Sequence, residues 1–128
     1  MKAHTSPFTG AGVVVAVLDT GVHYSHPDLA DNMWRNPDEV AGNGLDDDGN
    51  GYVDDYRGWD AVNQNGNVPS NGHGTHVSGI AGAHSNNNLG VAGVNWNVKT
   101  MPIRGSSGTE AVVVRAYTYV LTERRLYN

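Results

Sequence analysis

Residues 13–21 read Val-Val-Val-Ala-Val-Leu-Asp-Thr-Gly, and this stretch decides the fold of the 128-residue chain. Its apolar run is unbroken, rich in β-branched residues and closed by a turn, which is typical of a buried strand in a parallel sheet. In open α/β sheets, ligands and catalytic groups gather at the carboxyl ends of such strands. The stretch therefore predicts an α/β fold with Asp19 at a functional edge.

The rest of the chain continues this pattern as a single domain without internal repeats. Residues 22–70 are polar and rich in Gly, Asn, Asp and Pro, which predicts mostly loop. Small residues over 72–83 predict a closely packed helix, and residues 91–94 and 98–103 predict two short buried strands.

A last helix is predicted by the capping box that runs from Ser107 to Glu110. Apolar positions at helical spacing follow it, and they predict the face that packs against the sheet. These positions, with the cation that closes the stripe, are Val113, Ala116, Tyr117, Val120, Leu121 and Arg124. Strand, loop, helix, strand and helix is the order of an open α/β sheet.

Composition and charge exclude several classes of function. The 13 acidic and 8 basic residues give a net charge of −5, and residues 28–60 alone hold ten acidic and two basic side chains. Nucleic acid is therefore not expected as a partner. No apolar run approaches the ~20 residues that cross a bilayer, and no signal peptide follows Met1, so neither a membrane span nor a leader is expected. The absence of Cys excludes disulfides, Cys-ligated zinc and thiol catalysis.

A histidine at a predicted loop-to-helix junction is the second candidate for chemistry. Residues 71–79 read Asn-Gly-His-Gly-Thr-His-Val-Ser-Gly, so His73 lies between two glycines that let another group approach the imidazole closely. A carboxylate such as Asp19 would fix its second nitrogen and make His73 a general base. His76 and His84 are expected to be structural.

Three blocks of the sequence, residues 15–22, 26–29 and 71–82, resemble the subtilisin-like serine peptidases. The resemblance covers residues 10–119. It implies a three-layer α/β sandwich with a parallel sheet, in which Asp19 orients the imidazole and His73 acts as the general base on a serine hydroxyl. It also implies polypeptide substrates and an extracellular, secreted enzyme.

The departure from that family is the missing nucleophile. No Gly-Thr-Ser-Met-Ala-like block is present, and none of the seven serines has that context. Residues 1–128 are therefore interpreted as the N-terminal part of a peptidase domain, with an acidic insertion at about 36–60. We expect this fragment to be inactive without the missing C-terminal half of the domain.

The acidic insertion carries the spacing of a calcium loop. Carboxylate and amide oxygens alternate before a glycine, and further aspartates follow, although no Glu stands at the twelfth position. Ca²⁺ is therefore expected as a structural ion, with a solvated acidic turn as the alternative. The predicted ligands are Asp46, Asp48, Asn50, the carbonyl of Tyr52, and Asp54 or Asp55.

Two other classes of protein remain open at this point. The segment Val17-Leu18-Asp19-Thr20-Gly21 also resembles the active-site loop of dimeric aspartic peptidases, whose fold is all-β. A non-catalytic calcium-binding module derived from a peptidase accounts equally well for a chain without a nucleophile.

Overall fold

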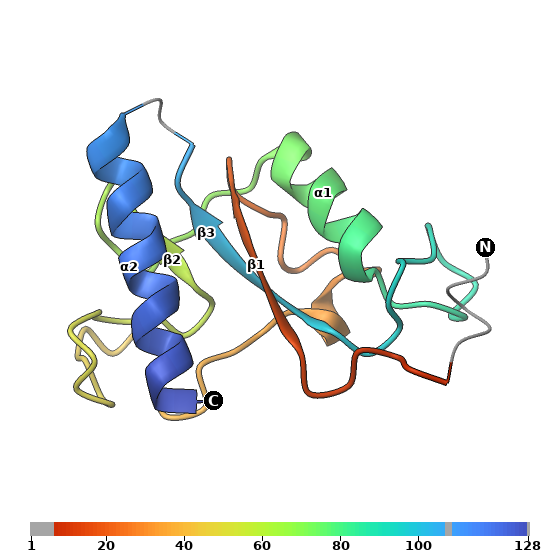
Figure 1. Cartoon of the computed structure of the whole chain (residues 1–128), viewed down its shortest axis with the longest axis horizontal. Helices are drawn as coiled ribbons and strands as arrows, with labels where there is room; N and C mark the ends of the chain where they lie inside the picture. The colour runs from red at the N-terminus through yellow and green to blue at the C-terminus, as the bar shows by residue number, and fades with distance from the viewer. Residues whose placement is uncertain (1–6, 107–108, 128) are drawn as a thin grey trace.

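The computed structural model describes residues 7–106 and 109–127, and a three-stranded parallel sheet lies at its centre (Figure 1). In spatial order the strands are β1 (Val14–Asp19), β3 (Lys99–Arg104) and β2 (Trp59–Asp60). Helix α1 (Gly72–Gly82) covers one face of the sheet, and helix α2 (Glu110–Tyr127) covers the other. These layers confirm the predicted α/β sandwich. Within the described residues, no helix is long and apolar enough to cross a bilayer.

Strand β3 is the central strand, and β1 is its neighbour on one side. The two pair in parallel register from Val14 opposite Lys99 to Asp19 opposite Arg104. β3 is buried along most of its length, as predicted, whereas β1 is only partly buried and Val14 is exposed. The expectation of a buried first strand is therefore wrong in this part of the chain, because β1 has a strand neighbour on one side only among the described residues.

Residues 91–94, predicted as a strand, form a loop instead. The backbone amides of Gly93, Val94 and Asn95 donate to carbonyl oxygens at the end of α1, on Ala83, Ile80 and Ala81 respectively. Donors committed to a helix terminus cannot form a strand ladder. The predicted long loop is confirmed, since residues 22–70 contain only a 3₁₀ turn, η2 (Ala30–Asn32), and the short strand β2.

The bounds of α1 lie within one residue of those predicted, and the helix packs closely against the sheet. Its buried residues are Gly74, Ser78, Gly79 and Gly82. A methyl group added at Gly74 would collide with the backbone carbonyl of Gly21, just beyond the end of β1. The small side chains therefore set how closely α1 approaches β1.

Two glycine substitutions in α1 test this packing. Gly74→Ala should destabilise the fold by about 1–3 kcal/mol, because the added methyl group meets rigid backbone. Gly79→Ala is the matched control, since a methyl group there meets nothing within 4 Å, and the higher helix propensity of Ala should raise stability by up to about 1 kcal/mol. Thermal unfolding followed by circular dichroism measures both, and equal melting temperatures would contradict the packing argument.

Helix α2 forms as predicted but packs on a different face. The side chains that it buries are Val112, Ala116, Tyr119 and Glu123. Three of the predicted contact residues, Val113, Tyr117 and Leu121, are exposed instead. The predicted face was wrong because Glu123, an acidic residue, occupies a buried position and breaks the apolar pattern. The predicted capping box starts at Ser107, which lies outside the described residues.

The aromatic core lies between α2 and the sheet. The rings of Tyr119 in α2 and Trp59 in β2 are stacked, and the ring of Tyr52 packs edge-on against both. Ile103 of β3 completes this cluster. A fold with two covering helices and parallel strands is not all-β, so the alternative of a dimeric aspartic peptidase is wrong.

Candidate active site

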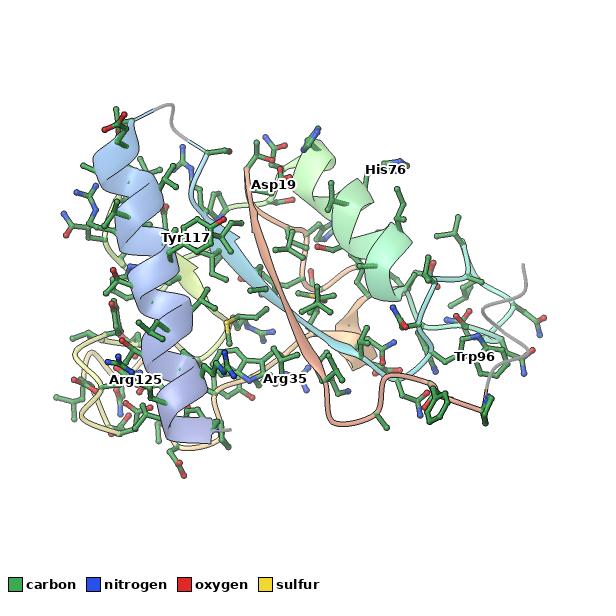
Figure 2. All side chains as sticks on the ribbon, viewed as in Figure 1. Asp19, Arg35, His76, Trp96, Tyr117 and Arg125 are labelled. Atoms are coloured by element: carbon green, nitrogen blue, oxygen red, sulfur yellow. The ribbon has the colours of Figure 1, made fainter. Side chains whose placement is uncertain are left out.

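The carboxyl end of β1 and the first turn of α1 meet at the top of the sheet, where Figure 2 labels Asp19 beside the start of α1. Nδ1 of His73 lies 2.7 Å from Oδ1 of Asp19. The structure thus brings together the two residues that the sequence singled out 54 positions apart. His76 points away from this pair and is exposed, so the expectation of a structural role for His76 is wrong in the described part of the chain (Figure 2).

A small hydrogen-bond network fixes the helix start beside the strand end. Asn71 caps α1, and its Oδ1 accepts hydrogen bonds from the amide of His73 at 3.0 Å and from the hydroxyl of Thr20 at 2.6 Å. The Thr20 hydroxyl also accepts from the amide of Gly74 at 3.2 Å. The end of β1 and the start of α1 are therefore joined by hydrogen bonds next to the Asp19–His73 contact.

Asp19 is held in its ionised form. Burial opposes its ionisation, but the hydrogen bonds from His73 and from the Thr20 amide outweigh this effect, so the pKa of Asp19 lies below its ordinary value. The ionised carboxylate therefore stabilises the folded state above the pKa of the unfolded chain, and this contribution is lost as pH falls through the lower folded-state pKa.

The His73 side chain is open to a reactant, with 72% of its surface exposed. Among the described residues, Nε2 makes no hydrogen bond, so Asp19 engages one ring nitrogen and leaves the other accessible. An ionised carboxylate beside Nδ1 favours the proton on that nitrogen. The arrangement can therefore accept a proton at Nε2.

The tautomer of His73 provides a direct test of this geometry. We expect neutral His73 to carry its proton on Nδ1, and Asp19→Ala to shift the population toward the Nε2–H form, because the acceptor at Nδ1 is removed. ¹⁵N chemical shifts of the imidazole measure this, with exposed His76 as the internal reference. An unchanged tautomer in Asp19→Ala would show that the carboxylate does not orient the ring.

No nucleophile accompanies this pair in the described part of the chain. The serines described are Ser25, Ser70, Ser78, Ser85 and Ser106, and none of them hydrogen-bonds to His73. Ser6 and Ser107 lie outside the described residues. The pair thus has the geometry of an oriented base without an adjacent hydroxyl.

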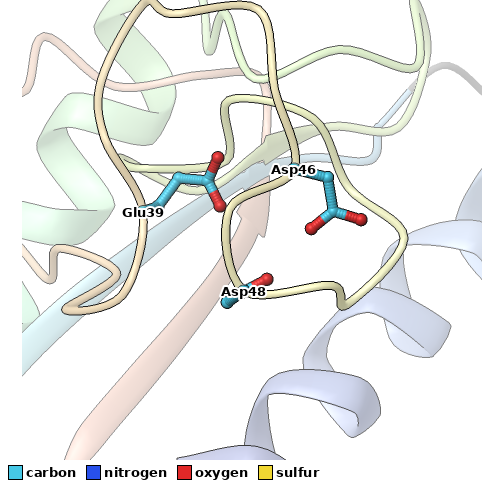
Figure 3. A group of neighbouring side chains, drawn as sticks. All are labelled: Glu39, Asp46 and Asp48. Atoms are coloured by element: carbon cyan, nitrogen blue, oxygen red, sulfur yellow. The ribbon is translucent and has the colours of Figure 1, made fainter.

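The acidic insertion forms a second cluster of candidate ligands, drawn in Figure 3. Glu39, Asp46 and Asp48 each place one carboxylate oxygen within 4.8 Å of the others. Glu39 is only 5% exposed, and its Oε2 is buried without a hydrogen-bond partner in the structure. Sequence spacing missed Glu39 because it lies seven positions before Asp46, outside the contiguous loop.

The other predicted ligands have different surroundings. The backbone amide of Asn50 donates to Oδ1 of both Asp46 and Asp48, and its side chain donates to Asp48, to Asp55 and to Glu123 of α2. Asp55 also accepts from the Tyr119 hydroxyl at 3.0 Å. These side-chain contacts tie the insertion to α2.

Asp54 and Tyr52 make side-chain contacts outside the three-carboxylate cluster. Asp54 accepts from the amide of Gly44 through Oδ2, and its Oδ1 is buried without a partner. The Tyr52 ring packs into the aromatic core. Of the predicted aspartate ligands, Asp46 and Asp48 form this cluster with Glu39.

Carboxylates crowd one another at this end of the molecule. Burial, reinforced by Asp55, raises the pKa of Glu123 to about 7. Burial also raises the pKa of Glu39, and the nearby carboxylates of Asp55, Asp48 and Asp47 add to that effect. The insertion therefore holds negative charge at an electrostatic cost that a cation would reduce.

The sequence is similar to proteins of one family. The profile of the subtilase family of peptidases (Peptidase_S8) matches residues 10–128. The chain is 53% identical over 87 residues to subtilisin-like protease 1 of Plasmodium falciparum, covering 66% of this chain and 13% of that protein. It is 38% identical over 116 residues to thermitase of Thermoactinomyces vulgaris, covering 86% of this chain and 33% of thermitase.

Solved structures agree with these relatives. The serine protease of Aeromonas sobria, solved in complex with the chaperone, superposes with a TM-score of 0.60 at 26% identity, over 89% of this chain and 17% of that one. A protease of Pseudoalteromonas arctica superposes with a TM-score of 0.53 at 31% identity, over 80% and 32% of the two chains. The chain thus spans a third or less of each protein compared here.

Proposed function

The chain belongs to the subtilase family, and from that premise we propose that it supplies two residues of the catalytic triad of a serine endopeptidase acting on polypeptides. Asp19 is the orienting carboxylate and His73 the general base. The observation that carries this proposal is the 2.7 Å contact between Asp19 Oδ1 and His73 Nδ1, with the imidazole otherwise exposed.

The mechanism follows from this geometry. Asp19 keeps the proton of the neutral ring on Nδ1, so Nε2 is free to accept the proton of a serine hydroxyl as that oxygen attacks the peptide carbonyl. The ionised carboxylate then stabilises the imidazolium, and His73 returns the proton to the leaving amine. We propose that the serine and the oxyanion donor come from sequence outside these 128 residues.

Two experiments test this assignment. The 128-residue chain alone should neither hydrolyse a peptide nor be labelled by a fluorophosphonate, because no serine is placed beside His73 in the described residues. In the full-length protein, Asp19→Ala or His73→Ala should lower kcat by roughly four to six orders of magnitude, because triad residues act as a unit.

His76→Ala is the matched control for those variants. It removes a histidine of the same helix that points into solvent, so turnover should be retained. Full activity of His73→Ala, or labelling of any serine in the short chain, would refute the proposed roles.

A second proposal concerns the acidic insertion. We propose that it binds Ca²⁺ through Glu39, Asp46 and Asp48, while Asn50 and Asp55 hold the loop against α2. The supporting observation is the buried, unpartnered Oε2 of Glu39, which lies in a cluster of hard oxygen ligands of the type that calcium prefers. The further proposed ligands are Asn50, the carbonyl of Tyr52, and Asp54 or Asp55. The other interpretation of this chain, a non-catalytic calcium-binding module derived from a peptidase, would use the same carboxylate cluster.

Calorimetry and thermal unfolding test the calcium site. We expect a Kd on the order of 10⁻⁴ to 10⁻³ M, because the loop lacks the bidentate Glu of tighter sites. Calcium at ten to a hundred times Kd should raise stability by about 1.4–2.7 kcal/mol. Asp46→Ala with Asp48→Ala should abolish binding, and Glu39→Gln should weaken it.

Asp38→Asn is the control for calcium binding, since it removes an exposed carboxylate of the same insertion that lies outside the cluster. If Asp38→Asn and the Asp46/Asp48 double variant gave the same heat of binding, the segment would be a solvated acidic turn and not a calcium site.

We also propose that the protein acts outside the cell. Support comes from a relative in Xanthomonas campestris described as an extracellular protease, which is 42% identical over 103 residues, 75% of this chain and 18% of that protein.

A further inference from the structure

Each of the three strands ends in a charged residue, and these three residues are neighbours across the sheet. Asp19 of β1 is in register with Arg104 of β3, and Arg104 is in register with Asp60 of β2. In-register neighbours of a parallel sheet point to the same face, and adjacent strands lie about 4.8 Å apart. The side chain of Arg104 therefore projects on the face where Asp19 meets His73, one strand away.

A buried anchor fixes this arginine. Nη1 of Arg104 lies 3.3 Å from Oδ2 of Asp60, whose side chain is only 2% exposed. The carboxylate of Asp60 also accepts hydrogen bonds from the amides of Val62 and Asn63 and from the Asn63 side chain. Because its partner is held by three further bonds, the guanidinium has a set position before any ligand arrives.

The guanidinium of Arg104 has N–H donors beyond the one that binds Asp60. Arginine carries five N–H donors in a planar fork, and within residues 7–106 and 109–127 the side chain of Arg104 makes one hydrogen bond. The side chain is 34% exposed. The remaining donors can therefore receive a carboxylate in the fork geometry that arginine favours.

We propose that Arg104 determines substrate specificity by pairing with an Asp or Glu of the polypeptide, within about four residues of the scissile bond. This inference rests on the proposed peptidase function. An extended peptide advances about 3.3 Å per residue, so a side chain two to four residues from the reacting carbonyl reaches a group one strand from Asp19. The competing role is purely structural, in which Arg104 only neutralises the buried Asp60.

Matched peptides separate these roles in the full-length protein. One fluorogenic peptide that the enzyme cleaves is varied by placing Asp, Ala or Lys singly at each of the four positions on either side of the scissile bond. The measured quantity is the ratio of kcat/KM for the Asp peptide to that for the Ala peptide. Because both rates come from one preparation, the ratio does not depend on how much of a variant folds.

At one or more positions the wild-type ratio should be roughly two to five, the range of a partly exposed ion pair, and it should fall as salt rises. Arg104→Gln should bring the ratio close to one, and Arg104→Lys should retain part of it. Arg125→Gln is the control, because Arg125 lies near the far end of α2, away from Asp19 (Figure 2), and its ratio should equal that of wild type.

Three results would overturn the inference. A wild-type ratio of one at every position, or the same ratio in Arg104→Gln as in wild type, would leave Arg104 with a structural role while the peptidase function stands. Failure of the wild-type protein to hydrolyse any peptide would overturn the peptidase function and this inference with it.

Discussion

The approach of α1 to the end of β1 is the constraint on which the candidate site depends. Gly74 packs against the carbonyl of Gly21 so closely that no side chain fits between them. Asp19 lies two residues before one of these glycines, and His73 lies one residue before the other. The backbone contact therefore sets the separation of the two side chains, and the Thr20–Asn71 hydrogen bond holds their orientation.

The acidic insertion depends on α2 in a comparable way. The hydroxyl of Tyr119 donates to Asp55, and the hydroxyl of Tyr127 lies 2.9 Å from both Asp48 and Asn36. These two tyrosines of α2 thus present hydroxyl donors to carboxylates of the acidic insertion. A cation bound among the carboxylates would thus stabilise the loop and the helix together.

The sequence predicted those features that rest on local pattern or on a motif. The β-branched run at residues 13–18 predicted β1, and the small residues after Asn71 predicted α1 to within one residue. The meeting of Asp19 and His73 was expected from family motifs, because no periodicity reports a contact across 54 positions.

The features that sequence missed depend on contacts between distant segments. Glu123 is buried where it accepts a hydrogen bond from Asn50, 73 positions away, so the packed face of α2 includes an acidic residue and Tyr117 is left exposed. Gly93 lies in a loop because its amide donates a hydrogen bond to the carbonyl of Ala83, at the end of α1. Glu39 joins the carboxylate cluster only after the insertion has folded, so loop spacing could not reveal it.

The register of β1 on β3 also determines the order in which this molecule can fold. Val14 pairs with Lys99, 85 positions along the chain, and every described strand pair is parallel, so the described strands are not joined to one another by hairpins. Closing such long loops before any contact compensates for their entropy slows folding. During synthesis, β1 must wait for β3 to emerge, and until then its apolar run is open to aggregation.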